Sequence, residues 1–149
     1  MGFLSCLSAA YYPNAMVAGF DVFEDASLED SSLKRAESNA RILGFSRRIT
    51  FEKQDIFRAD YSKGKFDLFV SNLVFHNLDK ERMNAYDRLA SWMKPGSFAV
   101  LGDLFFDYDM DQRRLRKLFA NVQERPADKT MKAPYRILVL SETKKKKKV

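Results

Sequence analysis

Two kinds of apolar pattern alternate along the chain. Apolar residues recur at helical spacing over residues 3–11, 33–43, 79–93 and 109–119. Short apolar runs with the length of buried strands occupy residues 16–22, 49–57, 66–70, 98–104 and 135–140. Turn and stop signals separate them at Pro13-Asn14, Gly44 and Pro95-Gly96, and Ser27 or Asp30 is expected to cap the second helix. The pattern therefore predicts alternating strands and helices.

This alternation is typical of an α/β fold. Strands joined through helices form a mostly parallel sheet with helices on both faces. Residues 120–124 and 135–140 are joined without a helix, so we expect them to form a C-terminal antiparallel hairpin at one edge. Ligands of open α/β sheets bind beyond the carboxyl ends of the strands. The residues at those ends are Asp21, Asp55, Ser71-Asn72 and Asp103.

The composition predicts one globular domain, residues 1–143, followed by a disordered lysine-rich tail, residues 144–149. Apolar residues make up 46% of the 149 residues and charged residues 31%, as in an ordinary folded domain. The net charge is +6, but five of the positive charges belong to Lys144 to Lys148, so the rest is nearly neutral. Such a run is either a solvated tail or an arm that binds nucleic acid weakly through phosphates.

Several classes of protein are excluded. Cys6 is the only cysteine and His76 the only histidine, which rules out an intrachain disulfide and the usual zinc sites, so no metal site is predicted. The first 20 residues carry no charged side chain, yet they lack a basic segment and are interrupted by Ser5, Ser8 and Pro13. We therefore expect a soluble, cytoplasmic protein with no membrane partner.

Five segments resemble, in order, motifs of the class I S-adenosylmethionine-dependent methyltransferases, which have a Rossmann-like fold. They are residues 17–21 (VAGFD), 36–40 (AESNA), 54–56 (QDI), 66–72 (FDLFVSN) and 93–98 (MKPGSF). The resemblance implies S-adenosylmethionine as the cofactor. It implies that Asp21 binds the ribose hydroxyls, that Asp55 binds the adenine amino group, and that Val22 and Ile56 cover the purine. Gly2 resembles the last glycine of the family's cofactor loop, and Ser71 completes the candidate cofactor-binding residues.

Simpler interpretations of these acids remain open. Asp21 could be a strand-end acid in a turn, and Asp55 a solvated acid in a turn.

The segment from Ser71 to Leu78 resembles the start of the family's reaction site, and its catalytic candidates are Asn72 and His76. In methyltransferases that act on planar amines this position resembles Asn-Pro-Pro-Tyr, but Leu73 and Val74 replace the prolines here. Imidazole changes charge near neutral pH, so His76 could accept a proton from a substrate. Alternatively it caps or packs under a helix, or the reaction needs no base because proximity suffices. Three aromatic residues that follow a strand could line a substrate pocket or belong to the core: Phe105, Phe106 and Tyr108.

The sequence as given has no counterpart of the family's first strand or of most of its glycine-rich loop. In the family this strand lies between those that resemble residues 17–21 and 66–72. The chain could extend upstream, these two strands could pair directly, or another chain could fill the gap, and an oligomer is possible.

Two functions remain open. The first is a methyltransferase, truncated as given, that acts on an unidentified small or macromolecular acceptor. The alternative is a non-catalytic remnant of the fold with a structural or interaction role.

Overall fold

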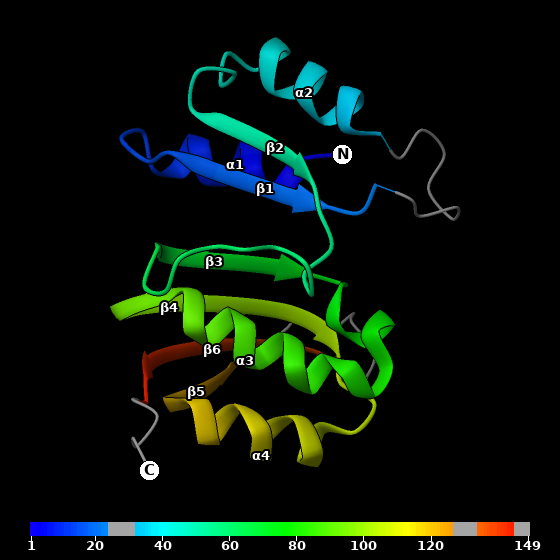
Figure 1. The fold of residues 1–149 in the computed structure, drawn as a ribbon, viewed down its shortest axis with the longest axis vertical. Helices are drawn as coiled ribbons and strands as arrows, with labels where there is room; N and C mark the ends of the chain where they lie inside the picture. The colour runs from blue at the N-terminus through cyan, green and yellow to red at the C-terminus, as the bar shows by residue number, and fades with distance from the viewer. Residues whose placement is uncertain (24–31, 127–133, 145–149) are drawn as a thin grey trace. The chain divides into compact units, whose positions relative to one another are not determined.

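A computed structural model describes residues 1–23, 32–126 and 134–144 of the chain (Figure 1). The chain divides into two compact units, Met1–Ala59 and Asp60–Val149. Each unit has its own sheet and its own helices, so each is described in turn.

The first unit contains two helices and a two-stranded sheet. Its elements are α1 (Phe3–Tyr11), β1 (Val17–Asp21), α2 (Leu33–Ile42) and β2 (Ile49–Lys53). β1 and β2 are parallel, with a register that runs from Val17 opposite Ile49 to Asp21 opposite Lys53. Helix α2 connects these two strands, which makes this unit the crossover predicted from the alternating pattern.

Small side chains pack the interior of the first unit. Cys6 and Ala9 of α1, Ala40 of α2 and Ile49 of β2 form its buried cluster. Short side chains let both helices approach the strands closely. Ser32 caps α2, because its Oγ accepts a hydrogen bond from the Arg35 amide at 3.1 Å. The caps expected at Ser27 or Asp30 lie outside the described residues.

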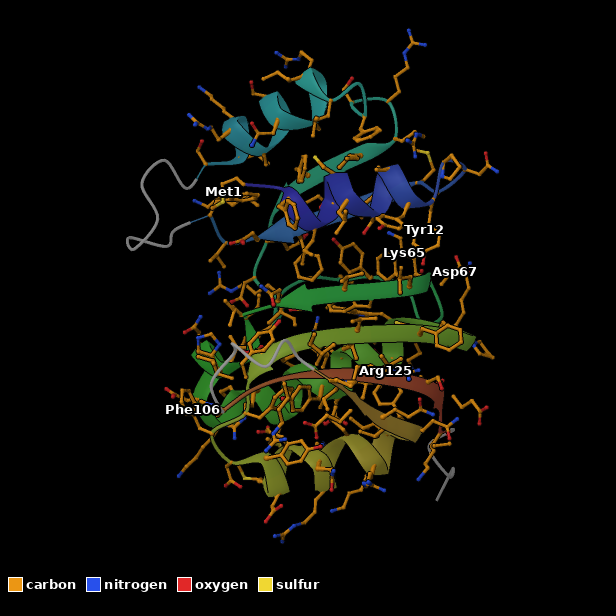
Figure 2. The ribbon with its side chains drawn as sticks, turned by 180° about the vertical axis from the view of Figure 1, so that it is seen from behind. Met1, Tyr12, Lys65, Asp67, Phe106 and Arg125 are labelled. Atoms are coloured by element: carbon orange, nitrogen blue, oxygen red, sulfur yellow. The ribbon has the colours of Figure 1, made fainter. Side chains whose placement is uncertain are left out.

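The second unit contains a four-stranded mixed sheet. Its elements are β3 (Phe66–Asn72), the 3₁₀ helix η1 (Phe75–Glu81), α3 (Arg82–Trp92), β4 (Met93–Leu104), α4 (Tyr108–Leu118), β5 (Phe119–Arg125) and β6 (Tyr135–Thr143). The strand order is β3-β4-β6-β5. β3 and β4 are parallel, and β6 is antiparallel to both of its neighbours. Helix α3 lies in front of this sheet in Figure 1 and behind it in Figure 2, and it packs against α4.

A buried ion pair joins α3 to α4. Asp111 of α4 is only 1% exposed, and its Oδ1 accepts a hydrogen bond from Arg82 Nε of α3 at 2.7 Å. The Tyr86 hydroxyl donates to the same oxygen at 3.2 Å, and its ring stacks on Phe75. Burial, together with the charge of Asp111, raises the pKa of Tyr86, so its hydroxyl remains a neutral donor in alkaline solution.

The single tryptophan also lies in the second unit. Trp92 is 3% exposed at the end of α3, and its ring packs edge-on against Tyr61 with a centroid distance of 5.2 Å. Tyr61 in turn packs edge-on against Phe66 of β3. This aromatic cluster ties the segment before β3 to the end of α3.

The predicted α/β class and the closing antiparallel hairpin are confirmed. Several boundaries differ from the expected ones. The strand expected over residues 49–57 ends at Lys53, because the Asp55 carboxylate accepts the Phe57 amide and forms a turn. The helix expected to end at Pro95-Gly96 ends at Trp92. Pro95 and Gly96 lie within β4 instead.

The described strands form two separate sheets. Of the helices in the described ranges, none is long and apolar enough to cross a bilayer.

The ion pair predicts a large stability effect. Arg82→Met leaves the buried Asp111 carboxylate without its cation, and we expect the free energy of unfolding to fall by about 3–5 kcal/mol. Urea unfolding followed by circular dichroism measures this change. Lys94→Met is the matched control, because Lys94 pairs with Asp67, a carboxylate that is 82% exposed. Such a pair contributes about 0–1 kcal/mol, so equal losses in the two variants would contradict the expectation.

Candidate functional site

The two acids predicted to bind the cofactor lie at one end of the first unit. Asp21 is the last residue of β1, and its carbonyl oxygen accepts a hydrogen bond from the Gln54 amide at 2.9 Å. This bond ties the residue before Asp55 to the end of β1. Both carboxylates are therefore at the carboxyl end of the parallel pair, where ligands of α/β proteins bind.

Each of these carboxylates has one oxygen engaged by its own turn. Asp21 Oδ1 accepts the Phe23 amide at 2.9 Å, and Asp55 Oδ1 accepts the Phe57 amide at 2.8 Å. The Oδ2 atom of each has no hydrogen-bond partner within the described part of the chain. The turn interpretation and the binding interpretation are thus compatible, since one oxygen orients the carboxylate and the other remains for a ligand donor.

Gly2 lies at the same end of this unit. It precedes α1, and Figure 1 shows the N-terminus on the side where the arrowheads of β1 and β2 point. Its φ of 73° is left-handed, and a Cβ there would lie 2.8 Å from Phe51 Cζ, so glycine fits this close approach. Of the two residues predicted to cover a purine, Val22 is exposed and Ile56 is buried.

The remaining predicted residues lie in the second unit, at the carboxyl end of its parallel strands. Ser71 and Asn72 end β3, where they pair with Leu101 and Gly102 of β4. Ser71 is buried and Asn72 is exposed. Leu73 then turns the chain with a φ of 56°, an uncommon left-handed conformation for leucine. This turn leads into η1, which carries His76.

His76 forms a short hydrogen bond to a buried carboxylate. Its Nδ1 lies 2.6 Å from Oδ1 of Asp103, which is near the end of β4. A carboxylate only accepts, so Nδ1 must carry a proton. In the neutral ring Nε2 is then the acceptor, and the ring is partly exposed, at 18%.

Three backbone amides also bind the Asp103 carboxylate. Oδ2 accepts from Val74 at 3.2 Å and from Phe75 at 2.7 Å, and Oδ1 accepts from Leu104 at 2.8 Å. Asp103 thus fixes the start of η1 and the orientation of the imidazole together. The sequence marked Asp103 only as a strand-end residue, because its 27-residue separation from His76 gives no local signal of pairing.

Asn72 is held by a residue that the sequence analysis missed. The Tyr135 hydroxyl at the start of β6 donates to Asn72 Oδ1 at 2.7 Å, so the Nδ2 group of Asn72 is not used in this bond. Gly102 lies beneath this bond, and a Cβ there would clash with the Tyr135 hydroxyl and lie 2.7 Å from Asn72 Oδ1. Three strands therefore determine how Asn72 is oriented.

The three aromatic residues after β4 have different environments. Phe105 is buried in the core, whereas Phe106 is 72% exposed. The Phe106 ring is edge-on to His76, with a centroid distance of 6.4 Å (Figure 2 labels Phe106). Tyr108 is half-buried and donates its hydroxyl to Glu124 at 3.1 Å. Of the three, only Phe106 offers an aromatic surface next to the imidazole.

Comparison with known proteins identifies similarities over nearly the whole chain. The family model described as a methyltransferase domain matches residues 2–148. A Nostoc punctiforme protein assigned as an O-methyltransferase has a TM-score of 0.75 at 17% identity, over 96% of this chain and 48% of that one. An S-adenosylmethionine-dependent O-methyltransferase from Thermotoga maritima has a TM-score of 0.63 at 15% identity, over 89% and 52%.

A third solved structure was determined with a bound small molecule. This family 2 O-methyltransferase from Planctomyces limnophilus, in complex with apigenin, has a TM-score of 0.68 at 13% identity, over 95% and 47%. At these identities the structures show a shared Rossmann-like fold. The chain spans about half the length of these three relatives. A comparison with curated proteins finds no match.

The packing under Asn72 predicts a coupled pair of substitutions. Gly102→Ala places a methyl group against the Tyr135 hydroxyl, and we expect a loss of about 1–3 kcal/mol of stability from overpacking. In a Tyr135→Phe background the hydroxyl is gone, so the same substitution is expected to cost less. A double-mutant cycle measured by urea unfolding gives the coupling. Equal costs in both backgrounds would show that this contact does not constrain Gly102.

Proposed function

Because the chain belongs to the methyltransferase domain family, we propose that it transfers a methyl group from S-adenosylmethionine to a hydroxyl oxygen of an acceptor. The observation that carries the proposal is the 2.6 Å hydrogen bond between His76 Nδ1 and Asp103 Oδ1. It leaves Nε2 able to take the proton that a hydroxyl loses on methylation.

The acids of the first unit fit the adenosine part of the cofactor. Oδ2 of Asp21 is available to accept from a ribose hydroxyl, and Oδ2 of Asp55 from the adenine amino group. Hydrogen bonds to ionised acceptors are about twice as strong as neutral ones. Both acids follow adjacent parallel strands, as such a ligand requires. When bound, the cofactor supplies a methyl group on a positively charged sulfur.

In the proposed reaction His76 acts as the general base. The acceptor oxygen would form its bond to the methyl carbon as the bond from that carbon to the cofactor sulfur breaks, releasing the neutral thioether S-adenosylhomocysteine, and the hydroxyl proton would move to Nε2 of His76. The ring becomes positively charged, and the Asp103 carboxylate stabilises that charge through Nδ1. A positioned base of this kind contributes about 10²–10⁴-fold to a rate.

An aromatic hydroxyl is the acceptor class that the surroundings of His76 favour. Phe106 is exposed beside the imidazole, and rings of this kind pair with other aromatic rings. The Planctomyces limnophilus relative with bound apigenin supports the same class. A planar amine is less well supported, because Leu73 and Val74 stand where the amine-specific motif has prolines.

Asp21→Asn tests cofactor binding. Losing a charged hydrogen-bond acceptor costs about 1.5–3 kcal/mol, so we expect about 10- to 100-fold weaker binding of S-adenosylhomocysteine by isothermal titration calorimetry. Asp109→Asn, an exposed acid on α4, is the control and should bind normally. Unchanged affinity of Asp21→Asn would refute the ribose role. No binding by the unaltered chain at millimolar cofactor would favour the non-catalytic alternative.

His76→Gln tests the base. Transfer of radiolabelled methyl groups to a panel of phenols and catechols should slow by about 10²–10⁴-fold, while affinity for S-adenosylhomocysteine stays unchanged. Asn77→Ala, an exposed neighbour in η1, should retain full activity. A His76→Gln variant with normal turnover would show that proximity alone drives transfer.

A further inference from the structure

The outer side of helix α1 is apolar and exposed. Phe3, Leu7 and Tyr11 are 72%, 40% and 76% exposed. Four residues separate each of them from the next, so the three side chains lie along one side of the helix. Ala10 lies on the same side and is also exposed. Phe3, Leu7, Ala10 and Tyr11 are named here the α1 stripe.

The α1 stripe is not the side of the helix that packs on its own unit. Cys6 and Ala9 of α1 lie in the buried cluster of the first unit. The helix therefore carries apolar side chains on two sides, and it contains no charged residue. Helices that are apolar all round are normally buried all round. The exposure of the α1 stripe therefore favours a partner that covers it.

The other outer helices are different. Lys34 is exposed on α2, and Arg113 is exposed on α4. Charged residues make up 31% of the whole chain, yet the first one in the sequence is Asp21. The surface of α1 thus departs locally from the rest of the protein. Contiguous exposed apolar surfaces of this kind mark interaction sites.

The α1 stripe is complementary to a second copy of itself. Leu7 lies midway between two aromatic residues, Phe3 and Tyr11. In a twofold dimer the same surface of both copies is used, so that each contact occurs twice. If two α1 helices pack antiparallel with the axis at Leu7, then Leu7 meets Leu7 and each Phe3 meets Tyr11 of the other copy. Aromatic rings that meet in this way attract each other.

The residues that follow α1 enlarge this surface enough for a dimer. Tyr12, labelled in Figure 2, is 54% exposed, and Met16 is 74% exposed. Because a large side chain has about 200 Å² of surface, these two residues and the α1 stripe expose up to roughly 600 Å². Two copies would together bury about 1,200 Å², which is the lower end of the range for specific interfaces. Tyr, Phe and Met are also enriched in such interfaces.

A second copy fits the α1 stripe better than a lipid bilayer or a charged partner does. Helices that bind in a membrane interface carry Lys and Arg on their polar side, and α1 has neither. A charged partner would bury its charges against a surface that offers none of the opposite sign, which is costly. Two apolar stripes leave no charge unpaired when they pack together.

We propose that two copies of this chain associate through the α1 stripe, with antiparallel α1 helices and a twofold axis at Leu7. No residue of the stripe belongs to the candidate cofactor-binding or catalytic residues. The proposal therefore goes beyond the proposed function and does not depend on it.

Analytical ultracentrifugation of the full chain at micromolar to near-millimolar concentrations tests this proposal. We expect a reversible equilibrium of monomer and dimer with a micromolar dissociation constant, because the interface is small. Leu7→Glu places two like charges against each other at the axis, so it should raise the dissociation constant at least 100-fold. Leu43→Glu is the matched control, because Leu43 is 55% exposed in the same unit but lies outside the stripe. It should dimerise as the unaltered chain does.

Mixing two variants tests the position of the axis. Leu7→Lys alone should dimerise as poorly as Leu7→Glu, whereas an equimolar mixture of the two should form a heterodimer, because opposite charges then face each other. Circular dichroism checks folding. If the Leu7 variants misfold, Tyr11→Ser should raise the dissociation constant at least tenfold, since tyrosines at the centre of an interface often dominate its affinity.

A chain that stays monomeric at every concentration would refute the proposal. Equal weakening by Leu7→Glu and Leu43→Glu would place the interface elsewhere, and a mixture of the two Leu7 variants that stays monomeric would contradict an axis at Leu7. Binding of the monomer to phosphatidylcholine vesicles, lost in Leu7→Glu, would identify a lipid surface as the occupant. A monomer whose unfolding temperature falls in Leu7→Glu but not in Leu43→Glu would show that the same chain covers the stripe.

Discussion

The candidate site of the second unit depends on the hydrogen bonds that the buried Asp103 carboxylate accepts. A buried charge is costly unless donors surround it, and here three backbone amides and one imidazole meet that need. Because two of those amides begin η1, the same carboxylate sets where the chain goes after β3 and how His76 is oriented. The path of this loop and the orientation of the imidazole thus have one cause, and a change at Asp103 would alter both.

The residues proposed for cofactor binding and for catalysis lie in different units. Asp21 and Asp55, proposed to bind the adenosine, belong to the first unit, whereas His76, the proposed base, and Asp103 belong to the second. Each group lies at the carboxyl ends of parallel strands, where ligands of open α/β sheets bind. In both units, therefore, the proposed functional residues lie at the carboxyl ends of parallel strands.

Much of this arrangement follows from local sequence. The apolar runs predicted where the strands lie, and the positions of Asp21 and Asp55 at strand ends made them candidate site residues. Each of these signals is contained in a few neighbouring residues. The 3₁₀ helix could not be predicted from local sequence, because its start is held by the distant residue Asp103. The early start of β4 could not be predicted either, because it depends on pairing with β3. The Tyr135–Asn72 bond spans 63 residues and is created by the strand order, so no local pattern reveals it. The roles of all the predicted site residues stay predictions: Gly2, Asp21, Val22, Asp55, Ile56 and Ser71 in binding the cofactor, and Asn72 and His76 in catalysis.

The position of the only tryptophan has a practical consequence. Trp92 is enclosed by Tyr61 and the end of α3, all within the second unit. Tryptophan fluorescence therefore reports on the second unit alone, because the first unit contains no tryptophan. Comparing this signal with the far-ultraviolet signal of all helices separates the melting of one half from that of the whole chain. Trp92 thus serves as an intrinsic fluorescent probe that shows whether the two units unfold in one cooperative step or in two.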